Sequence, residues 1–155
     1  YGVPVDSSLV ALPIAPQHCR MVCASPAYLA QHGSPQTPVE LASHRAVLYL
    51  RNERAYDLWR FSRGSEVQEV RVSGDYLCDD GEVARRWALA GHGIVYKAQL
   101  DVQADLDAGR LLPLLTDWQG ESAPFNLLCP HRAQVSERVK LLQVFLQQRC
   151  AALLA

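Results

Sequence analysis

The stretch from Val70 to Lys97 constrains the fold most, because it has the pattern of a strand, a loop, a helix and a second strand. Apolar and polar residues alternate from Val70 to Asp75 in the period of a half-buried strand, which residues 76–78 prolong. After the helix, Gly91 and Gly93 precede an apolar run over residues 94–96. This order favours a parallel, right-handed crossover, whose ligands bind beyond the carboxyl ends of the strands.

The helix within this stretch has an acidic start. Asp79 and Glu82 have the spacing of a capping box, which predicts that Asp79 caps the helix while Asp80 faces solvent. The alternative is that Asp79 and Asp80 form a carboxylate pair whose shifted pKa serves acid–base chemistry. The apolar face expected on this helix comprises Val83, Trp87 and Ala90.

The chain before this stretch predicts further strands and helices. Residues 6–15 are expected to be extended, residues 20–24 and 46–50 to be strands, and residues 51–56 to be charged and exposed. A helix over 27–31 would follow Ser25 as N-cap, and a second would follow a capping box of Thr37 and Glu40 and end near His44. Residues 59–61 and 69–77 are expected to form a hairpin around Gly64.

The chain after it continues in the same way. A helical run reaches Ala108, an edge strand interrupted by Pro113 spans 110–115, and a polar surface loop spans 116–123. A strand over 125–130 and a last helix capped by Ser136 follow. The wide apolar face expected on that helix comprises Val139, Leu142, Phe145, Leu146, Cys150 and Leu153.

Charge and cysteine content exclude several classes of protein. The 155 residues carry a net charge of −1 and no Lys/Arg run, so this chain is not expected to bind nucleic acid or an anionic membrane by itself. The five cysteines have no metal-binding or CxxC spacing, which is typical of buried thiols in a reducing cytoplasm. His18, Cys19 and Cys23 lack a fourth ligand, so we expect no metal and no cofactor.

Strands that alternate with helices favour an α/β fold with a parallel sheet. The strand-to-helix junctions at Ser25, at residues 78–80 and at residues 96–97 would then share one edge of that sheet, where ligands bind. Ser25 could instead be a plain N-cap, and Lys97 a solvated surface charge. No Ser-His-Asp or Cys-His set is evident from the spacing.

Five segments, in order, resemble the effector-binding domain of LysR-type transcriptional regulators. They are residues 20–33, residues 38–44, residues 72–74 with 80–82 and 87–94, residues 105–115, and residues 130–132 with 136–139. The resemblance implies a type-2 periplasmic-binding-protein-like α/β fold, here with one complete lobe and the remnant of a second. It further implies that residues 1–14 leave lobe I, that 15–124 form lobe II and that 125–155 return to lobe I with the last helix.

The same resemblance implies where an effector would bind. The lobe II positions that correspond to effector contacts are Ser25, Cys78, Asp79, Asp80, Tyr96 and Lys97. The three tryptophans are expected to pack in the core. The DNA-binding helix-turn-helix is expected to be absent from these residues, and the apolar face of the last helix is expected to associate with another copy or with a missing segment.

Three functions follow from these expectations. The first is a cytoplasmic ligand sensor that binds a small-molecule effector, forms a homodimer or tetramer, contacts DNA only through another domain and has no membrane contact. The second is the solute-binding protein of a transporter. The third is an enzyme with Asp79 or Asp80 as base. Because one fold serves many functions, the choice of the sensor depends on the family-like segments.

Overall fold

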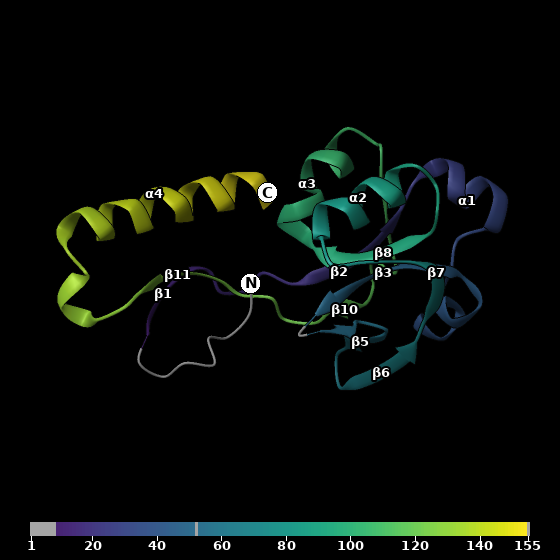
Figure 1. The fold of residues 1–155 in the computed structure, drawn as a ribbon, viewed down its shortest axis with the longest axis horizontal. Helices are drawn as coiled ribbons and strands as arrows, with labels where there is room; N and C mark the ends of the chain where they lie inside the picture. The colour runs from purple at the N-terminus through teal and green to yellow at the C-terminus, as the bar shows by residue number, and fades with distance from the viewer. Residues whose placement is uncertain (1–8, 52, 155) are drawn as a thin grey trace.

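The computed structural model describes residues 9–51 and 53–154. A mixed sheet forms its centre, in the order β4-β3-β8-β2-β9, with β7 beside β3 (Figure 1). Three strands run parallel: β3 (Arg45–Arg51), β7 (Ser73–Cys78) and β8 (Ile94–Ala98). Three run antiparallel to their neighbours: β2 (Arg20–Ala24), β9 (Leu112–Leu114) and β4 (Arg54–Ala55).

The parallel crossover expected in the central stretch is confirmed. β7, α2 (Gly81–Leu89) and β8 follow one another, and β3 lies between the two strands. All five residues of β8 are buried, as in a strand covered on both faces. The carboxyl ends of β3, β7 and β8 therefore meet at one edge of the sheet.

The expected single strand over 69–77 is wrong. β6 (Glu66–Arg71) ends before Val72, whose N–H donates to Asp57 O, and β7 then enters the main sheet. Gly74 permits this entry, because a Cβ atom there would lie 1.8 Å from the Ala46 carbonyl oxygen. β6 pairs instead with β5 (Leu58–Arg63). The expected hairpin around Gly64 is therefore confirmed, and Gly64 has a φ of 59°.

The cap of α2 is Asp80 and not Asp79. Asp80 Oδ1 accepts from the Glu82 N–H at 2.6 Å and the Val83 N–H at 3.2 Å, while Asp79 is exposed. The Glu82 carboxylate binds Arg85 and not a backbone N–H. The one-residue error arises because both aspartates precede the helix at plausible spacing.

The buried face of α2 also differs from the expected one. Ala84 and Ala88 are fully buried against the sheet, whereas Ala90 is exposed. Small side chains let the helix approach β3 and β8 closely. Trp87 lies at the border of this face and packs edge-on against Tyr76, with 5.2 Å between the ring centroids.

The loop expected over 116–123 is only partly a surface loop. Trp118 and Ala123 are buried, and β10 (Gln119–Gly120) joins β5 to make a small sheet in the order β10-β5-β6. Of the segment expected to be exposed, Arg54 and Ala55 pair with β3 as β4, and Tyr56 is half-buried. In Figure 1 the small sheet lies on the side of the main sheet away from α2 and α3.

The remaining helices begin as the sequence indicates, with one exception. α1 (Pro26–His32) is capped by Ser25 and ends at Gly33, and α3 (Gln99–Asp107) follows β8 directly. The segment after Thr37 is a 3-10 helix (Pro38–Ser43) in which the Thr37 hydroxyl donates to the Glu40 carboxylate. The expected capping box is therefore wrong, since the Thr37 side chain makes no hydrogen bond to a backbone N–H.

The two ends of the described chain lie side by side. β1 (Val10–Ala15) pairs antiparallel with β11 (Phe125–Cys129), and an irregularity after Pro13 accommodates that proline. A short 3-10 helix (Arg132–Gln134) leads to α4 (Glu137–Leu154), which runs along β1 and ends near α3 (Figure 1). The expectation for residues 6–8 lies outside the described residues.

α4 buries little of its apolar surface. Ser136 Oγ accepts from the Val139 N–H at 3.4 Å, which confirms the expected cap. On its β1 side, Gln143 and Gln147 donate to the Pro13 carbonyl. Cys150 is buried, but Leu141 is 70% exposed and Phe145 56% exposed. Within residues 9–51 and 53–154, no helix has the length and apolarity needed to cross a membrane.

Two apolar clusters cover the faces of the main sheet. One lies between the sheet and the β5–β6–β10 side and contains Trp59, Phe61, Tyr96 and Trp118. The other lies under α2 and α3 and contains Val47, Ala84, Val95 and Val102. Trp59 and Trp118 thus pack in the core, as expected, and Trp87 borders it.

Candidate functional site

One edge of the main sheet gathers side chains from four strands. The carboxyl ends of β3 and β7 lie in register, with Tyr49 opposite Cys78. β2 is antiparallel to β8, so its first residue, Arg20, lies opposite Ala98 and next to Lys97 along this edge. Aromatic, thiol and cationic groups therefore converge at the amino end of α2.

Lys97 is the most buried charged residue at this edge of the sheet. It is 7% exposed, which excludes the alternative of a solvated surface charge. Its Nζ lies 2.8 Å from Asp101 Oδ2 and 5.6 Å from the centre of the Tyr49 ring. It also lies against Gly81 at the start of α2, and a cavity of about 270 Å³ opens there.

The loop from Cys78 to Asp80 lies beside this lysine-containing cavity. The Cys78 thiol donates to the Asp80 carbonyl at 3.1 Å, and Asp80 is occupied as the α2 cap. Asp79 is exposed, and its side chain makes no hydrogen bond to another of the described residues. A single carboxylate is therefore presented to solvent without a fixed partner, and the alternative of an interacting Asp79–Asp80 acid–base pair finds no support in this geometry.

Two of the six expected contacts lie elsewhere. Ser25 is 3% exposed at the carboxyl end of β2, and the antiparallel direction of β2 puts it at the opposite edge, where it caps α1. The expectation that all three junctions share one edge is wrong for Ser25. Tyr96 points to the other face of the sheet from Lys97, and its hydroxyl donates to Arg60 O and accepts from the Glu121 N–H.

An arginine–tyrosine cluster continues the edge beyond Lys97. Arg20 donates to the Tyr49 hydroxyl at 2.5 Å, and its guanidinium lies 5.1 Å from the centre of the Tyr56 ring. Arg51 also lies 5.1 Å from that ring. Burial raises the pKa of both tyrosines, so their hydroxyls stay neutral. The sequence analysis missed this cluster because residues 51–56 looked like an exposed charged turn.

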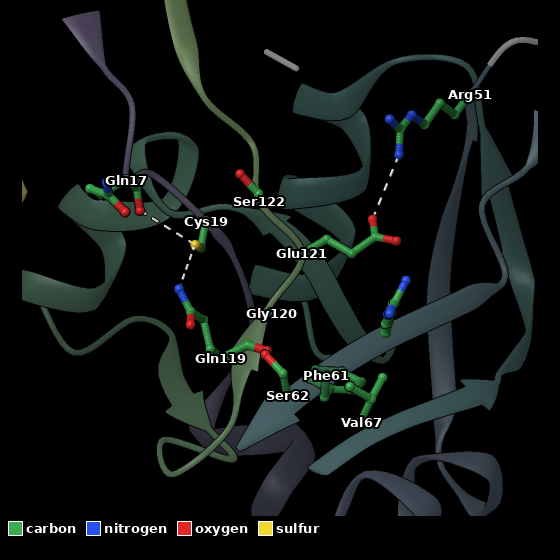
Figure 2. Close-up of a pocket in the computed structure, with 11 residues that line it drawn as sticks. Gln17, Cys19, Arg51, Phe61, Ser62, Val67, Gln119, Gly120, Glu121 and Ser122 are labelled. Atoms are coloured by element: carbon green, nitrogen blue, oxygen red, sulfur yellow. Dashed lines mark hydrogen bonds and ion pairs between the residues drawn. The ribbon is translucent and has the colours of Figure 1, made fainter. Parts of the chain in front are cut away.

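A cavity with a volume of about 610 Å³ lies next to this cluster (Figure 2). It is bounded by the segment that enters β2, by the tip of β3, by β5 and by residues 119–122. None of the six expected contacts lines it. Its polar and charged lining residues are Gln17, Cys19, Arg51, Arg60, Ser62, Gln119, Glu121 and Ser122.

Glu121 contacts its surroundings through both its side chain and its backbone. Its carboxylate accepts from the Tyr56 hydroxyl and lies 3.7 Å from Arg51 Nη1 (Figure 2). Its backbone N–H donates to the Tyr96 hydroxyl at 2.5 Å, and its carbonyl accepts from the Arg20 N–H at 2.8 Å. These contacts fix the last residues before β11 to the main sheet.

The two connecting segments between the β1–β11 pair and the main sheet are joined at the same place. His18 Nδ1 lies 2.7 Å from the Ala123 carbonyl oxygen, and the Ala123 N–H donates to the His18 carbonyl. His18 Nε2 accepts from the Leu100 N–H at 3.0 Å. This pattern requires a neutral imidazole protonated at Nδ1. The described residues contain no cluster of metal ligands, and His18 is engaged with the backbone.

Comparison with known proteins identifies the family. The model of the LysR substrate binding domain matches residues 1–151. The chain belongs to this family. The HTH-type transcriptional activator TtdR of Escherichia coli K12 is 31% identical over 79% of the chain and 38% of its own length. The uncharacterized HTH-type transcriptional regulator YhjC of the same strain is 33% identical over 94% and 48%.

Solved structures agree with this assignment. The regulatory domain of CrgA, a LysR-type regulator from Neisseria meningitidis, is 28% identical, with a TM-score of 0.75 over 94% of the chain and 71% of that domain. The fold is thus the expected type-2 periplasmic-binding-protein-like α/β fold of a LysR effector-binding domain. The chain spans less than half the length of these two curated relatives.

Proposed function

We propose that this domain senses a small-molecule effector in the cytoplasm and converts its binding into a change of shape. The observation that carries the proposal is that the 610 Å³ cavity is lined by both connecting segments, through Gln17 and Ser122, and by β5, through Arg60. A ligand there would contact the main sheet and both connections at once. It would therefore favour one orientation of the β1–β11 unit over others.

The proposed division of the chain follows the same geometry. Residues 1–14 and 125–155 would belong to lobe I and residues 15–124 to lobe II. Of the contacts expected from the sequence, Cys78, Asp79, Asp80 and Lys97 stay a prediction, because they lie along the sheet edge outside the 610 Å³ cavity. Ser25 and Tyr96 are not proposed as contacts, because Ser25 caps α1 at the opposite edge and the Tyr96 hydroxyl accepts from the Glu121 N–H.

The whole protein is proposed to act as a LysR-type regulator, by analogy with relatives named as HTH-type transcriptional regulators. DNA contact would come from a domain outside these 155 residues, and a dimer or tetramer would transmit the change. We propose binding without turnover, since the two aspartates of the 78–80 loop form no acid–base pair.

Hydrogen exchange on the 1–155 chain tests this proposal. A panel of charged and neutral metabolites would be screened by thermal shift, and each stabilising compound followed by exchange mass spectrometry. We expect a true effector to slow exchange at the Arg20 and Ala123 amides, which join the connecting segments. Gln17→Ala should weaken binding, whereas Gln103→Ala on α3 should not. Stabilising compounds that leave both amides unprotected would contradict the proposal.

A further inference from the structure

We propose that the 610 Å³ cavity selects a small, hydrophilic organic anion whose carboxylates pair with Arg51 and Arg60. This inference rests on the proposed function and adds the chemical class of the effector. The volume lies within the range of small-molecule sites. Polar groups form most of the lining, and only Phe61 and Val67 contribute large apolar side chains.

The charges of the lining favour an anion. Two arginines face one carboxylate, Glu121, and that carboxylate already accepts from the Tyr56 hydroxyl. The planar guanidinium groups match carboxylates with two parallel hydrogen bonds, which an ammonium group cannot do. A cationic ligand would instead meet two like charges and compete with Tyr56 for Glu121.

Both arginines are free to change partners. Arg51 Nη1 lies 3.7 Å from Glu121, and the two side chains are 47% and 29% exposed. Arg60 Nε lies 3.9 Å from Glu69, and these side chains are 57% and 53% exposed. Loose, solvated ion pairs of this kind stabilise a fold little, so a ligand carboxylate can replace them at small cost.

The Tyr96 hydroxyl joins the backbone of Arg60 to that of Glu121. Arg60 O accepts from the Tyr96 hydroxyl, which in turn accepts from the Glu121 N–H. Gly120 makes this bridge possible, since a Cβ atom there would lie 2.7 Å from the Tyr96 oxygen. An anion bound by both arginines would therefore connect β5 to the tip of β3 in the cavity that Glu121 also lines.

Calorimetry with defined probes tests the class of ligand. Succinate, malonate and glutarate would be titrated into the 1–155 chain at fixed ionic strength, beside succinamide as a neutral analogue and sulfate as an inorganic anion. At least one dicarboxylate is expected to bind at least tenfold more tightly than succinamide and sulfate. Arg51→Gln or Arg60→Gln should each weaken it about tenfold or more, and Arg51→Lys should weaken it less than Arg51→Gln.

Arg86→Gln is the matched control, because Arg86 is an exposed arginine on α2 outside this cavity. The anion proposal would be overturned by dicarboxylate binding that survives both arginine substitutions, by sulfate that binds as tightly, or by no binding of any dicarboxylate. A neutral compound that binds and protects the Arg20 and Ala123 amides would overturn the anion class but leave the sensor function intact. Failure of every compound, charged or neutral, to protect them would contradict the sensor function itself.

Discussion

Asp105 of α3 and Arg85 of α2 form a buried ion pair that joins the two helices above the main sheet. The Asp105 side chain is 2% exposed, and it accepts from Arg85 Nη1 and from Arg110 Nε at 2.8 Å. α2 begins at the Asp80 cap beside Lys97, and α3 carries the Lys97 partner Asp101. This pair therefore holds in place the two helices that frame the lysine-containing cavity.

Asp105→Asn is expected to destabilise the folded chain by about 1–3 kcal/mol, because it removes the buried charge that accepts from Arg85 and Arg110, while Arg85 keeps its second partner, Glu82. Urea denaturation followed by circular dichroism would measure the loss. Asp107→Asn, at an exposed position two residues later, is the control and should change the free energy of unfolding little. Equal effects of the two substitutions would show that the pair contributes nothing specific.

Glu82 gives the amino end of α2 a pH dependence. Hydrogen bonds from Arg85 and then Arg86 lower its pKa from 4.5 to about 2. A lowered carboxylate pKa means that the unfolded chain binds the proton more readily, so stability is present above pH 4.5 and is lost as the pH falls toward 2. Because Glu82 is 48% exposed, screening keeps the effect small.

The measurement compares the urea midpoints of the unsubstituted chain and Glu82→Gln at about pH 6 and about pH 3. The advantage of the unsubstituted chain should shrink at the lower pH, and it should also shrink in high salt, because exposed ion pairs are screened. A difference between the two proteins that stays constant with pH would contradict this assignment.

The five cysteines should separate into two reactivity classes. Cys23, Cys129 and Cys150 are buried, and burial raises the pKa of the Cys23 thiol to about 12, so these thiols stay protonated and protected. Cys19 and Cys78 are partly exposed. Ellman's reagent should therefore modify Cys19 and Cys78 first in the folded chain, with peptide mapping to identify them. All five should react in denaturant, and rapid native labelling of Cys23 would contradict the buried position.

The extent to which the sequence predicted the site differs from residue to residue. The apolar run of β8 and the helix that precedes it were predictable, because local periodicity defines them. The cap at Asp80 was missed by one residue, since adjacent aspartates satisfy the same spacing. Ser25 was misplaced because the direction of β2 depends on the non-local pairing with β8. Arg51 and Glu121 meet only through tertiary structure, so no local pattern indicated their cavity.

The exposed apolar side of α4 should make the 1–155 chain self-associate. Leu141, Leu142, Val144 and Phe145 are 45–70% exposed on consecutive turns, opposite the side that contacts β1. A contiguous apolar surface of this kind associates in water, because association removes it from solvent. Sedimentation velocity at micromolar concentrations should detect a dimer or larger species.

Leu141→Glu combined with Phe145→Glu should shift that species toward the monomer, because each carboxylate would be desolvated in the interface. Both side chains are already exposed, so the fold should persist, and an unchanged circular dichroism spectrum would verify this. Val39→Glu is the control: Val39 is 65% exposed but isolated on the 3-10 helix, so its substitution should leave the sedimentation coefficient unchanged. A monomeric unsubstituted chain, or a double variant that still dimerises, would show that α4 is not the surface of contact.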